Sequence, residues 1–264
     1  MTSSTRIHAA GRSRAPWACA AVLAAVALPL ALSAGPGASV VTYADGTCFS
    51  GEGPGGPWAP VKKGDAVKDG AYVRTESASK LELTLPDGSV LRLGDDTLFQ
   101  IETSLPKKDK GTSFSVLLGK TWAKVRTVSG GQTFDVKTKT AVAGVRGTVF
   151  SVLAQQDTAT TVKVFEGEVA VSNRPARERV AVLDEGQKKE PGTKEAKKGG
   201  RVEIAPPREI SKKQWEEMIA KAMQMVKVAA NGELSAPLAF DLDVEKKDDW
   251  VAWNLERDAA MKAR

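Results

Sequence analysis

The chain has 264 residues, 42% of them hydrophobic, and a net charge of +6. This length is enough for one sizeable hydrophobic core with appendages. The excess positive charge lies at the N-terminus and in residues 186–201, and the rest of the chain is near neutral. Because no basic stripe with interleaved aromatic residues occurs, the sequence argues against nucleic acid as a partner.

The N-terminal region has the pattern of an export signal. Basic residues precede an apolar run at residues 15–32, and small residues follow it. We expect residues 1–34 to be a signal peptide, cleaved after Ser33 or after Ala34. An uncleaved anchor in the inner membrane is the alternative, because the run approaches the roughly 18 to 20 apolar residues that span a bilayer. Either outcome predicts a periplasmic or cell-envelope protein.

Histidine and cysteine are scarce. Loss of the signal would remove His8, the only histidine, and would leave Cys48 as the only cysteine. An internal disulfide, a Ser-His-Asp triad, a Cys-His dyad and a metal site rich in His or Cys are then excluded. No carboxylate pair or cluster stands out at catalytic or metal-ligand spacing, so we predict no enzyme, no metal and no cofactor. We expect Cys48 to be a partly buried free thiol, with pairing between chains as the alternative.

Residues 40–184 have the pattern of short β-strands separated by turns. Leu81–Leu85 and Val90–Leu93 flank a Pro-Asp-Gly-Ser sequence. The alternation and the turn residues together predict a hairpin whose glycine takes a positive φ. Similar pairs of strands are predicted on either side of Gly119 and of Gly167.

No long helical periodicity interrupts this region, so the crossover helices that a doubly wound parallel sheet needs are lacking. We therefore predict a mainly β fold, with a hairpin-rich coiled or solenoid-like β-domain and a C-terminal α-helical appendage. A closed barrel and a jelly roll remain alternatives, because hairpins alone do not determine strand order. Trp58 and Trp122 lie beside apolar strand residues, which predicts core anchors rather than binding platforms.

The C-terminal third begins with a polar segment. Residues 185–207 are rich in Lys, Glu and Gly, which predicts a basic flexible linker. Contact of this linker with anionic lipid or cell-wall polymer is the functional alternative. We expect residues 208–264 to form a helical tail, whose first helix covers 211–229 after a serine N-cap. A second short helix is expected around Trp250–Trp253.

The predicted first helix has one apolar face. Trp215, Met218, Ile219 and Val226 recur on it at helical spacing. A single apolar face needs a surface to pack against. We take these four residues as candidates for binding a protein partner or the membrane interface, with docking on the chain's own β-domain as the alternative.

A second candidate for partner binding is Arg146, which lies between Gly144 and Gly147. The glycines permit close backbone approach or a positive φ, and the guanidinium offers a planar fork of donors. One interpretation is a contact with a ligand or partner. The other is a structural arginine that bonds loop carbonyls or a carboxylate such as Asp135 or Glu166.

The segment 138–152 contains Ala-Gly-Val-Arg-Gly-Thr-Val-Phe, which resembles the signature of FecR-like domains. There a threonine-rich strand leads to an Ala-Val-Arg-Gly-Thr-x-Phe core. The resemblance extends over residues 46–173, about half of the chain. Other pieces that are similar to the family, in the same order, are Trp58–Asp65, Asp69-Gly70, Asp87–Leu93, Gly119–Trp122 and Glu166–Val169.

The resemblance implies a regulator in the inner membrane whose periplasmic part receives a signal from an outer-membrane transducer. The cytoplasmic part of such proteins controls a sigma factor, and the few residues before the apolar run here are too short to pack as that domain. We therefore expect a non-catalytic binding or scaffold protein whose partner is an envelope protein or a cell-wall glycan. The alternative is a component of transmembrane signal transduction that acts with a separate membrane partner.

Overall fold

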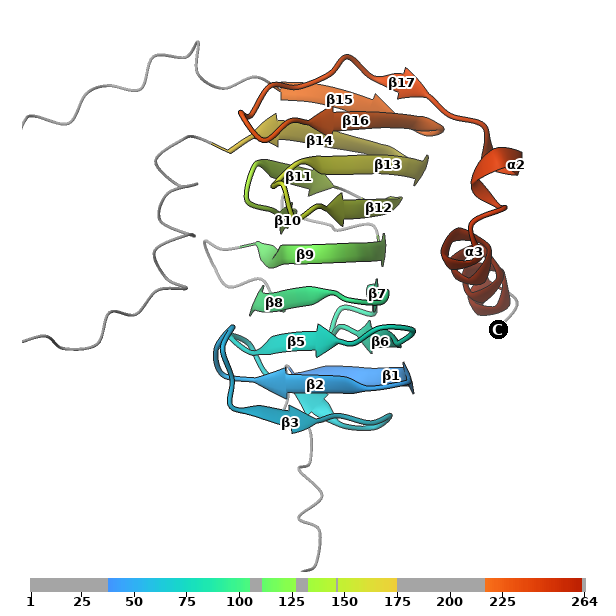
Figure 1. Ribbon diagram of the computed structural model, residues 1–264. Coiled ribbons are helices and arrows are strands. Elements are labelled where there is room, and N and C mark those ends of the chain that lie inside the picture. Colours follow the sequence, from blue (N-terminus) through green and yellow to red (C-terminus); the bar gives the residue numbers. More distant parts are fainter. Residues whose placement is uncertain (1–37, 105–110, 127–132, 146, 175–216, 263–264) are drawn as a thin grey trace, which may run out of the picture. The chain divides into compact units, whose positions relative to one another are not determined.

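The computed structural model describes residues 38–104, 111–126, 133–145, 147–174 and 217–262 (Figure 1). The expected signal segment at 1–34 and the expected linker at 185–207 lie outside these residues. The described part is built from β-strands, with two helices near its C-terminal end. The predicted mainly β fold is therefore confirmed.

Strand pairing divides the described strands into two sheets that share one long strand. Sheet A consists, in order across the sheet, of β4 (Ala66–Val67), β1 (Ser39–Asp45), β6 (Lys80–Thr84), β7 (Val90–Leu93), the second half of β9 (Thr112–Lys124), β12 (Val149–Ala154), β13 (Thr160–Glu166), β16 (Gln224–Val228) and β17 (Leu238–Ala239). Sheet B consists of β3 (Trp58–Pro60), β2 (Cys48–Gly51), β5 (Tyr72–Thr75), β8 (Leu98–Thr103), the first half of β9, β10 (Phe134–Lys137), β11 (Ala141–Val145), β14 (Glu168–Asn173) and β15 (Glu217–Lys221). Among these pairings β9–β10 is parallel and the others are antiparallel.

The chain passes repeatedly from one sheet to the other, as expected of a coiled fold (Figure 1). Three passages from sheet A to sheet B or back lie at glycines with positive φ: Gly46 after β1, Gly147 before β12 and Gly167 after β13. Positive φ is open to glycine at little steric cost, which lets the chain turn sharply between the sheets. Gly147 belongs to the Val-Arg-Gly-Thr segment, so one role of that segment is to form such a corner.

Two of the predicted strand pairs are not hairpins. The strand β9 continues through Gly119, which has a φ of +92°, and its two halves lie in different sheets. The strands on either side of Gly167 pair with other strands, β13 with β12 and β16, and β14 with β11 and β15. A glycine between two alternating segments suits a sheet-to-sheet corner as well as a hairpin turn. The hairpin formed by β6 and β7 is confirmed, and its turn residue Gly88 has a φ of +82°.

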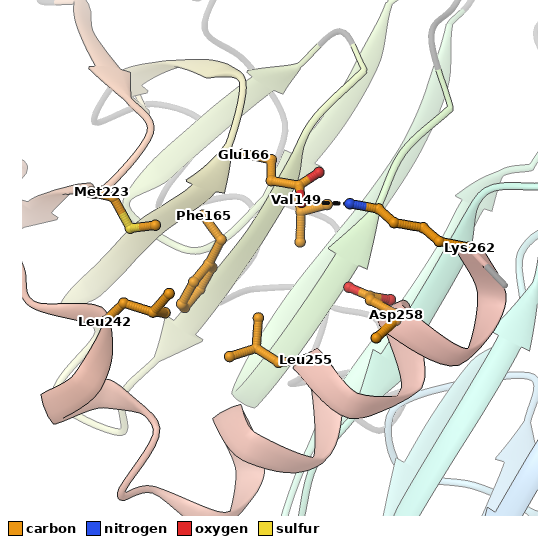
Figure 2. Close-up of a pocket in the computed structure, with 9 residues that line it drawn as sticks. Val149, Phe165, Glu166, Met223, Leu242, Leu255, Asp258 and Lys262 are labelled. Atoms are coloured by element: carbon orange, nitrogen blue, oxygen red, sulfur yellow. Dashed lines mark hydrogen bonds and ion pairs between the residues drawn. The ribbon is translucent and has the colours of Figure 1, made fainter.

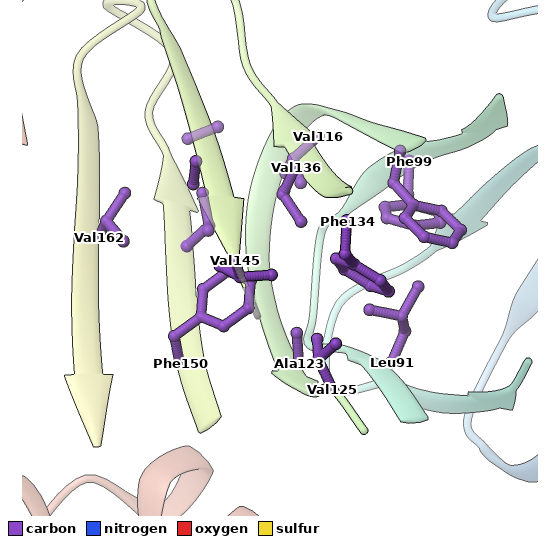
Figure 3. Close-up of a cluster of buried hydrophobic side chains, with 14 of the residues drawn as sticks. Leu91, Phe99, Val116, Ala123, Val125, Phe134, Val136, Val145, Phe150 and Val162 are labelled. Atoms are coloured by element: carbon purple, nitrogen blue, oxygen red, sulfur yellow. The ribbon is translucent and has the colours of Figure 1, made fainter. Parts of the chain in front are cut away.

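The main core lies between the two sheets (Figure 3). Phe99, Phe114 and Phe134 come from three neighbouring strands of sheet B, with ring centroids 5.5 and 5.3 Å apart along the series. Phe150 of sheet A is equally buried. Burial of each such ring contributes roughly 2–3 kcal/mol. Cys48 is a free thiol that is buried in this core, rather than only partly buried as expected.

The predicted helix at 211–229 is wrong for residues 217–228, which form the strands β15 and β16. Ala220, Val226 and Val228 are fully buried in the main core, and Ile219 and Lys227 point outward, so burial follows the period of two. Edge positions beside β14 and β13 supply backbone partners for these strands, and this pairing outweighs the helical spacing of the apolar residues. The β-fold therefore extends past residue 184.

Candidate binding surface on sheet A

Two helices cover part of the outer face of sheet A (Figure 1). The short helix α2 (Leu242–Glu245) begins at Asp241, whose carboxylate accepts a hydrogen bond from the Asp243 amide. The helix α3 (Asp249–Lys262) follows, which confirms the expected second helix around Trp250–Trp253. We call residues 241–262 the helical arm.

Buried charges join α3 to sheet A. The Arg92 guanidinium donates from Nε to Glu82 Oε2 at 2.7 Å, and its Nη2 lies 2.8 Å from Asp258 Oδ1. Arg257 donates two hydrogen bonds of 2.9 Å to the two oxygens of the Glu82 carboxylate. The side chain of Arg92 has no exposed surface and that of Glu82 has 2%. The four residues therefore form a closed network in which each buried charge has a partner of opposite sign.

The environment of Glu82 keeps it ionised. Burial alone would raise the pKa of this carboxyl, but hydrogen bonds from Arg257, Arg92 and Thr42 lower the pKa to about 2. A carboxyl with this pKa has no proton to donate near neutral pH and is a very weak base, so it is unsuited to general acid–base catalysis. The network thus stabilises the docked helix and is unsuited to proton transfer.

An aromatic cluster lies beside the charges, between sheet A and the helical arm. Trp122 of β9 packs against Phe165 with ring centroids 4.3 Å apart, and it donates from Nε1 to Asp258 Oδ2 at 3.0 Å. Trp250 of α3 is buried in the same cluster. Trp122 is thus an anchor, as expected, but in this second cluster rather than in the main core. Trp58 is not a core anchor, because it is half-exposed on sheet B.

A pocket of about 270 Å³ opens between the helical arm and sheet A (Figure 2). Its walls are mainly apolar and include Phe165, Met223 and Leu255. The exposed pair Glu166–Lys262, with 2.8 Å between carboxylate and ammonium, borders it. The size and lining suit one apolar side chain or a small apolar ligand.

Residues 71–170 match the family described as FecR protein. The chain contains a FecR domain. The matched region runs from β5 to β14, so Glu82, Arg92 and Trp122 belong to the FecR domain, whereas α3 lies outside the match.

Two crystal structures of a candidate anti-sigma factor from Parabacteroides distasonis, at 1.65 and 2.50 Å resolution, are similar to the chain. In each comparison the sequence identity is 20% and the TM-score is 0.44. The similar region covers 64% of this chain and 60% of the other, so this chain spans less than two thirds of that protein. No curated protein matches the chain.

The structure does not bring the predicted partner-binding residues onto one face. Met218 is half-buried against the main core, and Val226 is fully buried in it. Ile219 points the other way and is 55% exposed on the edge strand β15. Arg146 and Trp215 lie outside the described residues.

Sequence reasoning missed the charge network that holds α3. Glu82 and Arg92 each interrupt an apolar strand at a position that alternation assigns to the solvent face. A signal was present, since the hairpin register places Glu82 opposite Arg92. Arg257 and Asp258, which pair with Glu82 and Arg92, are far away in the sequence, and no local pattern links them to β6 and β7.

Two negative findings apply to the described residues. None of the helices there has both the length and the apolar character required to cross a membrane. Within the same residues no group of three or more His, Cys, Asp or Glu side chains is placed to hold a metal ion.

Proposed function

We propose that this protein is a non-catalytic binding component of cell-envelope signalling. The match of residues 71–170 to the FecR family carries this proposal. The FecR domain supplies a rigid two-sheet framework, and the helical arm adds a pocket with exposed apolar side chains beside it. A framework of this kind is suited to present surfaces to a partner.

The state of the carboxylates supports the non-catalytic part of the proposal. Asp258, which borders the pocket, is held by Arg92 and by Trp122, and Glu166 is paired with Lys262. Glu82 is fixed as an anion. The three carboxylates are thus engaged in contacts that hold the fold together, which favours a structural role for them over that of paired catalytic carboxylates.

Export to the envelope is the second part of the proposal. The basic residues, the apolar run at 15–32 and the small residues after it support a cleaved signal or an inner-membrane anchor. A protein that is anchored in this way would reach a membrane-embedded partner without a spanning helix in its folded domain.

The rim of the pocket is the surface that we assign to the protein partner. Met223 lines the pocket and is 37% exposed, and its carbonyl accepts a hydrogen bond from the Phe240 amide. Leu238 and Val244, at 47% and 58% exposure, lie on either side of Phe240 in the chain. Exposed apolar side chains on segments that contribute to a pocket are typical of interaction sites.

A cross-linked pull-down from envelope fractions tests the proposal. The tagged exported protein is compared with a Leu238→Ser/Val244→Ser variant and with Leu153→Ser, which changes an apolar residue of β12 that is 40% exposed. We expect a membrane-embedded regulator or outer-membrane receptor to be enriched by the wild type and Leu153→Ser, and to be lost with the double variant. Recovery of peptidoglycan-associated proteins alone, or of the bait alone, would contradict the proposed signalling role.

A further inference from the structure

The outer face of sheet B carries a line of side chains away from the helical arm, which packs on sheet A through contacts with Glu82, Arg92 and Lys163. The inward-facing residues Val73, Phe99 and Val116 are buried in the main core, so their neighbours along each strand face outward. The strand register aligns six residues in one row across the sheet, one each on β3, β2, β5, β8, β9 and β10. In that order they are Trp58, Gly51, Tyr72, Gln100, Ser115 and Lys137. We call this row the sheet-B track. At about 4.8 Å between strands, it is roughly 24 Å long.

One end of the sheet-B track is aromatic and rigid. The Arg74 guanidinium lies 4.8 Å from the centroid of the Trp58 ring and 5.2 Å from that of Phe49. A Cβ atom at Gly51 would lie 3.1 Å from the Trp58 ring, so the absence of a side chain there lets the indole lie against β2. Tyr72 follows Gly51 in the row. Half-exposed rings that are held in place offer flat apolar surfaces with polar tips at low entropic cost.

The other end is polar. Glu102 accepts a hydrogen bond from the Ser115 hydroxyl, and its second oxygen accepts one from Lys137 Nζ at 2.6 Å. Gln100 stands in the row between Tyr72 and Ser115, and its amide can both donate and accept hydrogen bonds. Amide, hydroxyl, ammonium and carboxylate groups therefore follow one another beside the aromatic end.

The two cations beside the track are already paired. Arg74 is 2.8 Å from the Glu76 carboxylate, and Lys137 is paired with Glu102. A cation that is already paired attracts a further anion weakly, so an anionic polymer or nucleic acid gains little here. The surface is suited to an uncharged ligand that is rich in hydroxyl groups.

We propose that the sheet-B track binds a linear, uncharged polysaccharide, with sugar rings stacked on Trp58 and Tyr72 and hydroxyl groups bonded to Gln100, Ser115 and Glu102. An extended chain fits a straight row across several strands, and a sugar ring presents an apolar C–H face together with a hydroxyl rim. The inference rests on the proposed envelope location, where cell-wall glycans are present. It concerns a different face from the pocket rim that is assigned to the protein partner.

The test measures binding of cellohexaose and of the N-acetylglucosamine hexamer to the purified exported protein by calorimetry. We expect at least one hexamer to bind, and Tyr72→Ala and Gln100→Ala each to weaken binding tenfold or more. Tyr43→Ala is the matched control, because Tyr43 is also a half-buried tyrosine but lies on sheet A, with 4.5 Å from Arg257 Cζ to its ring centroid. This control should bind as the wild type does. Thermal unfolding of each variant verifies that the variant is folded.

Two results would overturn the inference: no binding of either hexamer by the folded wild type, or equal binding by the wild type and both track variants. A pull-down that captures a membrane protein while neither hexamer binds would leave the proposed function standing and remove the polysaccharide site. Hexamer binding that depends on Tyr72, together with a pull-down that recovers only the bait, would support the polysaccharide site and contradict the proposed signalling function.

Discussion

The Arg92 guanidinium on β7 and the Asp258 carboxylate on α3 lie 2.8 Å apart, with 0% and 9% of their side chains exposed. This ion pair joins the FecR domain to a helix outside the family match. Because Asp258 also accepts the Trp122 indole N–H, one carboxylate links a buried cation and a buried aromatic ring. Part of the attachment of α3 to the FecR domain therefore passes through this one carboxylate.

Replacement of Asp258 by alanine should destabilise the protein strongly. The change leaves the buried Arg92 with one anionic partner fewer and the Trp122 N–H without its acceptor. Loss of one partner from a buried pair costs about 3–5 kcal/mol. Urea unfolding measures the effect, and Lys262→Ala, which removes an exposed partner of Glu166, should leave the midpoint unchanged. Equal midpoints for Asp258→Ala and the wild type would contradict a stabilising role for this contact.

Stability should fall in acid because of Glu82. The folded state holds its pKa at about 2, below the ordinary value of 4.5, so the ionised carboxylate favours folding. This stabilisation is fully present above pH 4.5 and is lost as the pH falls toward 2. The pKa difference corresponds to roughly 3 kcal/mol. The free energy of unfolding, measured with urea at a series of pH values, should fall steeply in acid for the wild type and less steeply for Glu82→Gln. Equal slopes for the two proteins would assign the acid sensitivity to other groups.

The sequence was sufficient to predict a coiled β-domain, because alternation and turn residues are local signals. It was insufficient at residues 217–228, where Met218, Ile219 and Val226 suit the spacing of a helix as well as that of strands. The strand edges of β13 and β14 decide between the two, and they are formed by residues far back in the chain. The charge network at Glu82 depends on distant partners in the same way.

The glycines illustrate the same limit. Alternating segments around Gly119 predicted a hairpin, and the structure has a strand that changes sheet there. The two outcomes share a positive φ and differ only in what surrounds the glycine, which no local pattern reports.

Substitution of Gly119 by alanine should therefore be more harmful than substitution of Gly64. Both have a strongly positive φ, +92° and +96°, so both variants carry backbone strain of about 1–2 kcal/mol. A Cβ at Gly119 would also lie 2.6 Å from Thr97 Cα, whereas a Cβ at Gly64 meets nothing within 4 Å. Thermal unfolding of the two variants isolates the steric effect, which we expect to add about 1–3 kcal/mol. Equal losses of stability would show that the corner at Gly119 relaxes without cost.

Cys48 should be unreactive in the folded protein. Its thiol is buried in the main core, and burial raises the pKa from 9.0 to about 11, so almost no thiolate forms at pH 8. A thiol reagent such as iodoacetamide should label Cys48 only when the protein opens, at a rate that follows unfolding by urea. Asp258→Ala, which weakens the fold, should therefore label faster than the wild type at equal pH, whereas Lys262→Ala should not. Rapid labelling of the folded wild type would contradict the burial of Cys48 and with it the packing of β2 against β6, whose Lys80 carbonyl lies 3.8 Å from the Cys48 sulfur.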